Sequence, residues 1–352
     1  MACGGAGDAR PAHAVHALGG TTMGTLWRAS LSAPPGADLH PLHDGIQACL
    51  DEVVAQMSTW ERDSDISRYN RAPAGSWPAL PQPFFEVLRE ALAIAADSGG
   101  AVDPTVGPLV AAGGFGPGGR GGAVPDAAAL AAARARVGWR RVELDPSSRR
   151  ALQPGGVGLD LSGIAKGHGV DAAVAWLRAR GVPAALVEVG GELRGYGRKP
   201  DGTPWKVLAE AWPEDDGNGS DEGAGGNGDS DGTGSGGEDG AQPLPPCVLL
   251  LDDAAVATSG DHWHRFERDG RLYSHTIDPR TGAPVHGAPA AVTVVAATAL
   301  AADAWATALT VLGPVQGFDV AQERRIAARF VVREAGGARE RATEAFGRWR
   351  QA

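Results

Sequence analysis

Cysteine is scarce in this sequence. The 352 residues contain only Cys3, Cys49 and Cys247, which are too few and too far apart for a disulfide framework or a zinc knuckle. Long apolar runs are also missing, because stretches such as Val292–Trp305 contain polar residues and fall short of the ~20 residues that span a bilayer. The sequence therefore predicts neither a disulfide-rich scaffold nor a transmembrane segment.

An excess of basic charge is absent as well. The formal net charge is -10, and nine of the acidic residues lie within residues 214–240, where there is no Lys or Arg. The rest of the chain carries 32 basic and 33 acidic residues and is nearly neutral. Nucleic-acid binding would require a strongly basic domain, so we expect no nucleic acid among the partners.

The start of the chain, Met-Ala-Cys-Gly-Gly, lacks the basic and apolar regions of a signal peptide. We expect residues 1–17 to form a flexible leader and the protein, as written, to be cytoplasmic. The alternative is a periplasmic, membrane-anchored lipoprotein whose signal has been omitted, in which Cys3 would carry the lipid.

A second segment is unlike the rest of the chain. Residues 213–242 are mostly Gly, Asp, Glu, Ser and Asn, a composition that buries too little apolar area to fold. Trp205–Ala209 before it and Cys247–Leu251 after it both have the pattern of a strand. We therefore predict a hairpin whose loop is a long disordered insertion, since loop-closure entropy grows slowly with length. An acidic binding tail is the alternative.

The remaining periodicities predict a mixture of helices and strands. Apolar residues at helical spacing predict helices at Leu42–Trp60, Pro83–Asp97, Ala127–Val137, Gly167–Arg180 and Leu300–Leu312. Short β-like runs, which follow a Gly-rich strand region at residues 18–30, occupy Arg141–Leu144, Val157–Leu161, Ala185–Val189, Tyr273–Ile277 and Ala291–Val295.

Asp303 and Thr307 are the first candidates for chemistry. They lie four residues apart in an otherwise apolar helical pattern, so they share one face of the helix. A carboxylate and a hydroxyl offer two hard oxygen ligands of the kind that Mg²⁺ prefers. The alternative is structural, with Asp303 capping the helix and Thr307 bonding back to a carbonyl.

A second candidate region surrounds Lys166. A β-like run ends in Ser162-Gly163, and a helix opens at Lys166-Gly167. Free N–H groups at such a helix start bind phosphates, and Lys166 would add positive charge. The spacing fits neither a Walker loop nor a dinucleotide fingerprint, so an ordinary strand-to-helix turn is equally compatible.

Two further segments complete the set. Gly190-Gly191-Glu192 follows a strand and offers a second close approach of backbone to ligand, although such pairs are commonly plain turns. His275 precedes the turn Asp278–Gly282, and histidine is the usual general base near neutral pH. A zinc site built on the neighbouring histidines is disfavoured because no Cys/His ligand spacing is present.

Taken in chain order, these segments resemble the ApbE family of FAD:protein FMN transferases. The resemblance covers about residues 18–313 and rests on Met23–Thr25, Met57–Trp60, Ser64–Asn70, Asp103–Gly107, Gly114–Pro117, Asp160–Gly167, Gly190–Glu192, Thr258–Asp261, His275–Gly282 and Asp303–Thr307. It implies a mixed α/β (α+β) fold, similar to the tunnelling fold, in one domain over residues 18–352.

The resemblance also implies a reaction. FMN would move from FAD, the substrate, to a Thr or Ser hydroxyl of an acceptor flavoprotein, with formation of a phosphoester and release of AMP. The implied acceptors are subunits of electron-transfer or ion-pumping complexes. A Mg²⁺-dependent FAD pyrophosphatase and a non-catalytic flavin carrier are the alternatives.

Finally, the resemblance implies roles for particular residues. Mg²⁺ would be held by Asp303, Thr307 and the backbone carbonyl near Gly163, His275 would be the base, and Lys166 would assist at the phosphates. Flavin or nucleotide contacts are implied for Met23, Trp60, Asp103, Gly163, Lys166, Gly190, Gly191, Glu192, Ser259, Asp261, His275 and Asp278. The His262-Trp263-His264 stretch and the acidic insertion depart from the family pattern.

Overall fold

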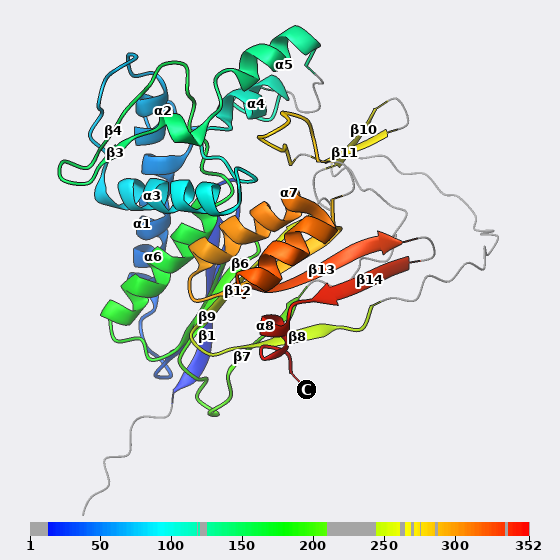
Figure 1. Ribbon diagram of the computed structural model, residues 1–352. Coiled ribbons are helices and arrows are strands. Elements are labelled where there is room, and N and C mark those ends of the chain that lie inside the picture. The colour runs from blue at the N-terminus through cyan, green and yellow to red at the C-terminus, as the bar shows by residue number, and fades with distance from the viewer. Residues whose placement is uncertain are drawn as a thin grey trace, which may run out of the picture.

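An eight-stranded antiparallel sheet forms the centre of the fold (Figure 1). The computed structural model describes residues 13–117, 119, 125–209, 244–260, 265–268, 271–274, 276–285, 288–334 and 337–351. The strands follow the order β1 (Ala14–Thr22), β2 (Thr25–Ala33), β5 (Ala185–Val189), β6 (Glu192–Tyr196), β9 (Ala254–Gly260), β12 (Ala291–Ala296), β13 (Ala327–Glu334) and β14 (Gly337–Ala342).

Three long helices cover one face of this sheet (Figure 1). They are α1 (His40–Met57), α6 (Ala165–Ala179) and α7 (Ala299–Glu323). Ile46 and Leu50 of α1 pack with Val170 and Leu177 of α6 over β2 and β5, while α7 packs on β12 and β13. The helical spacing of these apolar residues is what buries one side of each helix.

The opposite face of the sheet is covered by a separate hairpin. Strands β7 (Trp205–Ala209) and β8 (Cys247–Leu251) pair antiparallel, and helix α8 (Glu344–Gly347) packs beside them. Neighbouring residues of β12 point to opposite faces: Val294 belongs to the cluster under α7, whereas Val295 belongs to the cluster under β8. The predicted hairpin is therefore confirmed, and its connecting segment 213–242 lies outside the described residues.

A layer made mostly of short helices lies at one end of the molecule, beside α1 and α7 (Figure 1). Its apolar centre includes Ile66, Phe84, Leu88 and Leu159. The elements at this end are α2 (Asp65–Asn70), α3 (Gln82–Asp97), α4 (Gly107–Ala112), α5 (Ala127–Arg134), the short 3-10 turn η1 (Trp139–Arg141), β3 (Leu144–Asp145) and β4 (Arg150–Ala151). Nearby, β10 (Arg265–Arg268) pairs with β11 (Arg271–Ser274).

Helix α7 consists of two helical segments. The first agrees with the predicted helix Leu300–Leu312, because the backbone leaves the helical conformation at Gly313, whose φ of 79° lies in the left-handed region. Glycine tolerates this conformation, and a second segment, which runs to Glu323, begins at Pro314, since proline is favoured in a first helical turn. The sequence did not predict this second segment.

Two expectations are corrected. Val157–Leu161 forms no strand in the described part of the chain. Gly158 makes an isolated parallel bridge to Val106, but at Leu159 the Asn70 side chain takes both backbone bonds: its amide donates to the Leu159 carbonyl, and its oxygen accepts from the Leu159 N–H. Strand β1 begins at Ala14, so the predicted leader of residues 1–17 is shorter than expected, and its first twelve residues lie outside the described ranges.

Candidate active site

Two adjacent hairpin turns and the start of a helix meet at one end of the sheet. Met23 and Gly24 form the turn between β1 and β2, and Gly190 and Gly191 form the turn between β5 and β6. All four have positive φ, as a two-residue hairpin turn of this hand requires. Because β2 pairs with β5, both turns lie at the same end of the sheet. They lie next to Lys166, which is in the first turn of α6.

Met23 occupies this turn at a conformational cost. Its φ is 49°, a value that is uncommon for a residue with a side chain. The Met23 methyl group lies beside Gly169 of α6. Strain of this kind concentrates at functional sites.

Helices α6 and α7 touch through glycine at this same end. A Cβ atom at Gly167 would lie 2.3 Å from the carbonyl oxygen of Ala299. The backbones of the two helix starts are therefore closer than any other residue type would allow. This approach places Asp303 and Thr307, on the first turns of α7, over the start of α6.

The contact predicts a clear result for Gly167→Ala. Because the clash is with backbone, the added methyl must push α7 away from α6, and we expect a loss of about 1–3 kcal/mol in the free energy of unfolding. Chemical denaturation measures this change. Gly347→Ala in α8 is the control, since nothing lies within 4 Å of its Cβ position; equal stability of the two variants would contradict the close approach.

Asp303 is buried against the start of α6. It is 5% exposed, and its Oδ2 accepts a hydrogen bond of 3.1 Å from the Gly167 N–H. Burial raises the pKa of Asp303, while the Lys166 cation and the Gly167 N–H act in the opposite direction. A buried carboxylate of this kind is stable in its charged form only with a compensating cation.

Lys166 and Glu192 form an ion pair beside Asp303. The Lys166 Nζ lies 2.5 Å from Glu192 Oε1, and Glu192 is 3% exposed. Burial, with Asp303 nearby, raises the pKa of Glu192 to about 8, against the effect of Lys166. Burial lowers the pKa of Lys166, but Asp303 and Glu192 outweigh it and raise the value above that of a free lysine. Lys166 is thus held by a carboxylate, which sequence reasoning did not foresee.

Two of the residues expected for a metal site, Thr307 and Gly163, lie close together. The Thr307 Oγ1 lies 3.4 Å from the Cβ position of Gly163, and Asp303 is one helical turn before Thr307. Burial opposes the ionisation of Asp303 and of Glu192, and a bound cation would favour the charged forms of both carboxylates. Within the described ranges, no three His, Cys, Asp or Glu side chains are grouped to share a metal; the expected set instead combines one carboxylate with a hydroxyl and a carbonyl, which suits Mg²⁺.

Other expected site residues have structural partners. The buried Asp103 carboxylate accepts hydrogen bonds from the Thr105 N–H and hydroxyl and from the Trp139 N–H, and Asp278 is held by two 2.9 Å bonds from the Arg280 guanidinium. These contacts hold the loops in which the two carboxylates lie.

Trp60 and Ser259 are two further expected site residues. Trp60 is 64% exposed, so its indole face is open. Ser259 lies near the end of β9, where its carbonyl oxygen is 3.4 Å from the Thr310 hydroxyl of α7. Asp261 and His275 lie outside the described residues.

Asp171 and Arg194 form an ion pair that the sequence did not single out. The Arg194 Nη1 lies 2.5 Å from Asp171 Oδ1, and the same carboxylate accepts hydrogen bonds from the start of α7. The only sequence signal was the position of Asp171, five residues after Lys166 in the predicted helix.

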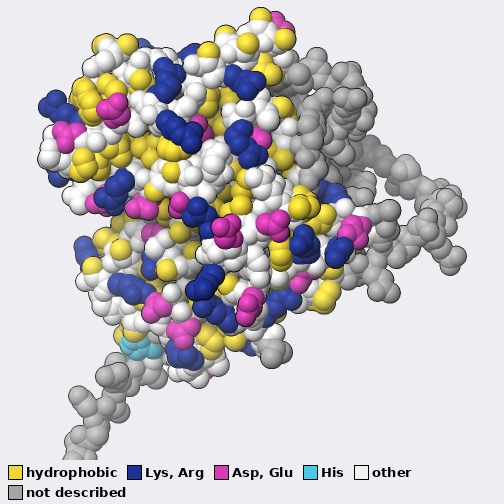
Figure 2. Space-filling view, in the orientation of Figure 1, with side chains coloured by type: hydrophobic (Ala, Val, Ile, Leu, Met, Phe, Trp, Pro, Cys, Tyr) yellow, Lys and Arg dark blue, Asp and Glu magenta, His cyan; other side chains and the backbone are white. Residues whose placement is uncertain are grey.

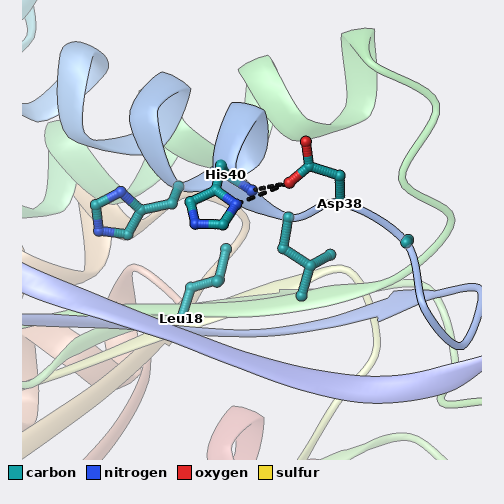
Figure 3. A pocket seen from close by; sticks show the side chains of 6 residues that line it. Leu18, Asp38 and His40 are labelled. Atoms are coloured by element: carbon teal, nitrogen blue, oxygen red, sulfur yellow. Dashed lines mark hydrogen bonds and ion pairs between the residues drawn. The ribbon is translucent and has the colours of Figure 1, made fainter.

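An open pocket lies farther along β1, away from these residues. It has a volume of about 560 Å³ and is lined by Leu18, Ala37, Asp38, Leu39, His40 and His43. Figure 3 shows the His40 ring bonded to Asp38, at 2.8 Å. This hydrogen bond raises the pKa of His40. None of the expected site residues lines the pocket.

The visible surface has no large region of one charge. On the face shown in Figure 2, Lys and Arg side chains are interspersed with Asp and Glu. None of the helices in the described part of the chain combines the length and apolar character needed to cross a bilayer.

Comparisons with known proteins identify close relatives. A profile described as the ApbE family matches residues 23–330. An FAD:protein FMN transferase of Vibrio cholerae is 36% identical over 342 residues, which cover 97% of this chain and 94% of that protein. The enzyme of the same name from Klebsiella pneumoniae is 35% identical and covers 94% of this chain and 87% of its own.

Solved structures agree with this relationship. The apo form of the Pseudomonas stutzeri flavinyl transferase ApbE superposes with a TM-score of 0.82 at 38% identity, covering 96% of this chain and 97% of that one. The ApbE protein of Thermotoga maritima has a TM-score of 0.78 at 26% identity, covering 96% of this chain and 100% of its own.

Proposed function

The chain belongs to the ApbE family, and from that premise we propose that it transfers FMN from FAD to a Thr or Ser hydroxyl of an acceptor flavoprotein in a Mg²⁺-dependent reaction. The acceptor oxygen forms a bond to the phosphorus of the FMN half. The bond between this phosphorus and the bridging oxygen of the pyrophosphate breaks, and AMP leaves with that oxygen. The product is a phosphoester.

The observation that carries this proposal is the buried Asp303 carboxylate beside Thr307 and Gly163. A buried carboxylate with raised pKa, next to a second carboxylate and only one ammonium, fits the site of a divalent cation. Asp303, Thr307 and the Gly163 carbonyl would hold Mg²⁺, which supplies charge neutralisation at the phosphates when bound.

The Lys166 ammonium would also neutralise charge on the phosphates. Its ammonium is fixed by Glu192 at 2.5 Å, so it does not have to be ordered when the substrate arrives. A pre-oriented cation stabilises developing phosphate charge at little reorganisation cost. Glu192 is in this account the residue that positions Lys166, and the Gly190–Gly191 turn next to it gives backbone access to the ligand.

His275 is proposed as the base that accepts the proton of the acceptor hydroxyl. The proposal rests on the family resemblance. An unassisted hydroxyl is a weak nucleophile, so the reaction needs a group of this kind. His275 follows strand β11, which ends at Ser274, and precedes the turn fixed by Asp278 and Arg280.

Flavin binding is proposed for Met23, in one of the two hairpin turns, and for Trp60. Met23 lies in a strained turn, and the exposed indole of Trp60 offers a face on which an aromatic ring system can stack. Asp103, Ser259, Asp261 and Asp278 are proposed to contribute through the loops in which they lie. The acceptor is proposed to be a subunit of an electron-transfer or ion-pumping complex.

Intact-mass spectrometry tests the proposal directly. The purified chain is mixed with FAD, Mg²⁺ and a candidate acceptor domain, beside a tube without acceptor, a tube with EDTA, and a tube whose acceptor Thr is replaced by Val. We expect the acceptor mass to rise by one FMN phosphoester, with AMP release, only in the complete mixture with an intact Thr. AMP and free FMN without a mass gain, over a panel of acceptors, would establish the pyrophosphatase instead, and no AMP in any tube would favour the carrier.

A further inference from the structure

The carboxylate of Asp171 joins helix α6 to the start of helix α7. Asp171 lies two turns into α6, and its Oδ1 and Oδ2 accept hydrogen bonds from the Ala299 N–H at 3.0 Å and from the Leu300 N–H at 2.9 Å. The first N–H groups of a helix have no partner within the helix. A carboxylate from another helix thus satisfies the first two of them.

The rest of the first turn of α7 is satisfied locally. The Thr298 hydroxyl accepts from the Ala301 N–H at 3.2 Å, and the Ala302 N–H donates to the Thr298 carbonyl. Among the described residues, the two hydrogen bonds to Asp171 are those that connect this turn to another element. A carboxylate at this position is also favoured by the positive end of the helix dipole.

The connection runs in both directions. Asp171 of α6 accepts from the start of α7, and Asp303 of α7 accepts from the Gly167 N–H at the start of α6. Each helix therefore supplies an anion to the first turn of the other, about the close approach at Gly167. Arg194 on β6 binds Asp171 at 2.5 Å, which ties this pair of helices to the sheet.

From this geometry we propose that Asp171, fixed by Arg194, is a positioning residue that sets the placement of Asp303 and Thr307 over Gly163 and so controls affinity for the divalent cation. This inference rests on the proposed function for the role of the cation, but the link between the helices does not depend on it. Asp303 follows Leu300 by three residues, so a movement of the first turn of α7 displaces Asp303 directly.

The alternative is that Asp171 merely stabilises the fold. Thr298 separates the two roles, because its hydroxyl caps the same helix end through a bond within the start of α7 itself. Thr298→Ala should lower the melting temperature by a few degrees and leave the cation affinity within about twofold of the wild type. Asp171→Asn removes the charge that links the helices at nearly constant volume, and residues that support metal ligands typically alter metal affinity by about 10–100-fold.

The experiment compares these variants by titration with Mn²⁺, followed by the EPR signal of the free ion, with FAD present and no acceptor. We expect the Mn²⁺ dissociation constant to rise about 10–100-fold in Asp171→Asn and to recover partly in Asp171→Glu, which restores the charge. Arg194→Met should give a smaller increase. Equal affinities in Asp171→Asn and Thr298→Ala would overturn the positioning role.

A second measurement does not involve the metal. Hydrogen exchange of the segment that contains the Ala299 and Leu300 amides, without Mn²⁺, should be faster in Asp171→Asn than in the wild type, and unchanged protection would show that the link is not formed. Asp303→Asn distinguishes failure of the metal assignment from failure of the link between the helices. If this variant binds Mn²⁺ as the wild type does, the metal assignment is wrong and the proposed effect of Asp171 on affinity fails with it. The exchange data test the link independently.

Discussion

Asp303→Ala is expected to lower the rate of AMP release from FAD by about 10³-fold or more. Asp303 supplies the one carboxylate of the proposed Mg²⁺ set, and loss of about 4 kcal/mol of charge stabilisation corresponds to that factor. The stability of the protein without Mg²⁺ should not fall in parallel, because the substitution removes a buried charge that lies near Glu192. The measurement is AMP release at saturating FAD, with the acceptor present, over a range of Mg²⁺ concentrations.

The matched control is on the same helix. Asp319 is an exposed aspartate of α7, and Asp319→Ala should leave AMP release unchanged. FAD binding, followed by flavin fluorescence, should persist in Asp303→Ala with reduced affinity. If the variant turns over at the wild-type rate with Mg²⁺ as the only metal, Asp303 is not a ligand and the proposed site must be sought elsewhere.

The spacing of Asp303 and Thr307 could be predicted from the sequence because it is local. Four residues in a helix place two side chains on one face, whatever the rest of the fold does. The pairing of Trp205–Ala209 with Cys247–Leu251 was predictable for a similar reason, since both segments are short β-like runs that flank one loop. Local sequence is sufficient for both.

The partners of Lys166 could not be predicted in this way. Lys166 and Glu192 are 26 residues apart, and they meet because α6 begins beside the turn between β5 and β6. Nothing in the sequence near Lys166 indicates that its charge is already paired. The same limit applies to Asp171, whose carboxylate bonds to amides 128 and 129 residues away.

Errors in the expected elements have a related cause. Val157–Leu161 has the alternation of a strand, but the Asn70 side chain takes the place of a neighbouring strand at Leu159. A tertiary contact thus decides between outcomes that local propensity leaves open. The end of the predicted helix at Leu312 was correct because its signals, Gly313 and Pro314, are local, whereas the second segment of α7 that follows them was not predicted.

His275→Gln should reduce FMN transfer to the acceptor by about 10²–10⁴-fold, the usual contribution of a positioned general base. Glutamine keeps much of the side-chain volume but cannot accept the proton of the acceptor hydroxyl. Binding of FAD and of Mn²⁺ should change little, because the metal set lies on α7 and the start of α6. The rate of acceptor mass gain, measured in single turnover, gives the size of the effect.

The pH dependence separates a lost base from a displaced loop. In the wild type, transfer should fall as the pH drops, because only the neutral imidazole accepts a proton. In His275→Gln the residual rate should follow hydroxide concentration and rise through the range where the wild type has levelled off. His40→Gln is the control. His40 is exposed, is bonded to Asp38 and lines the pocket beside β1, away from the candidate site. A His275→Gln profile parallel to that of the wild type would show that the histidine aligns the acceptor and that another group takes the proton.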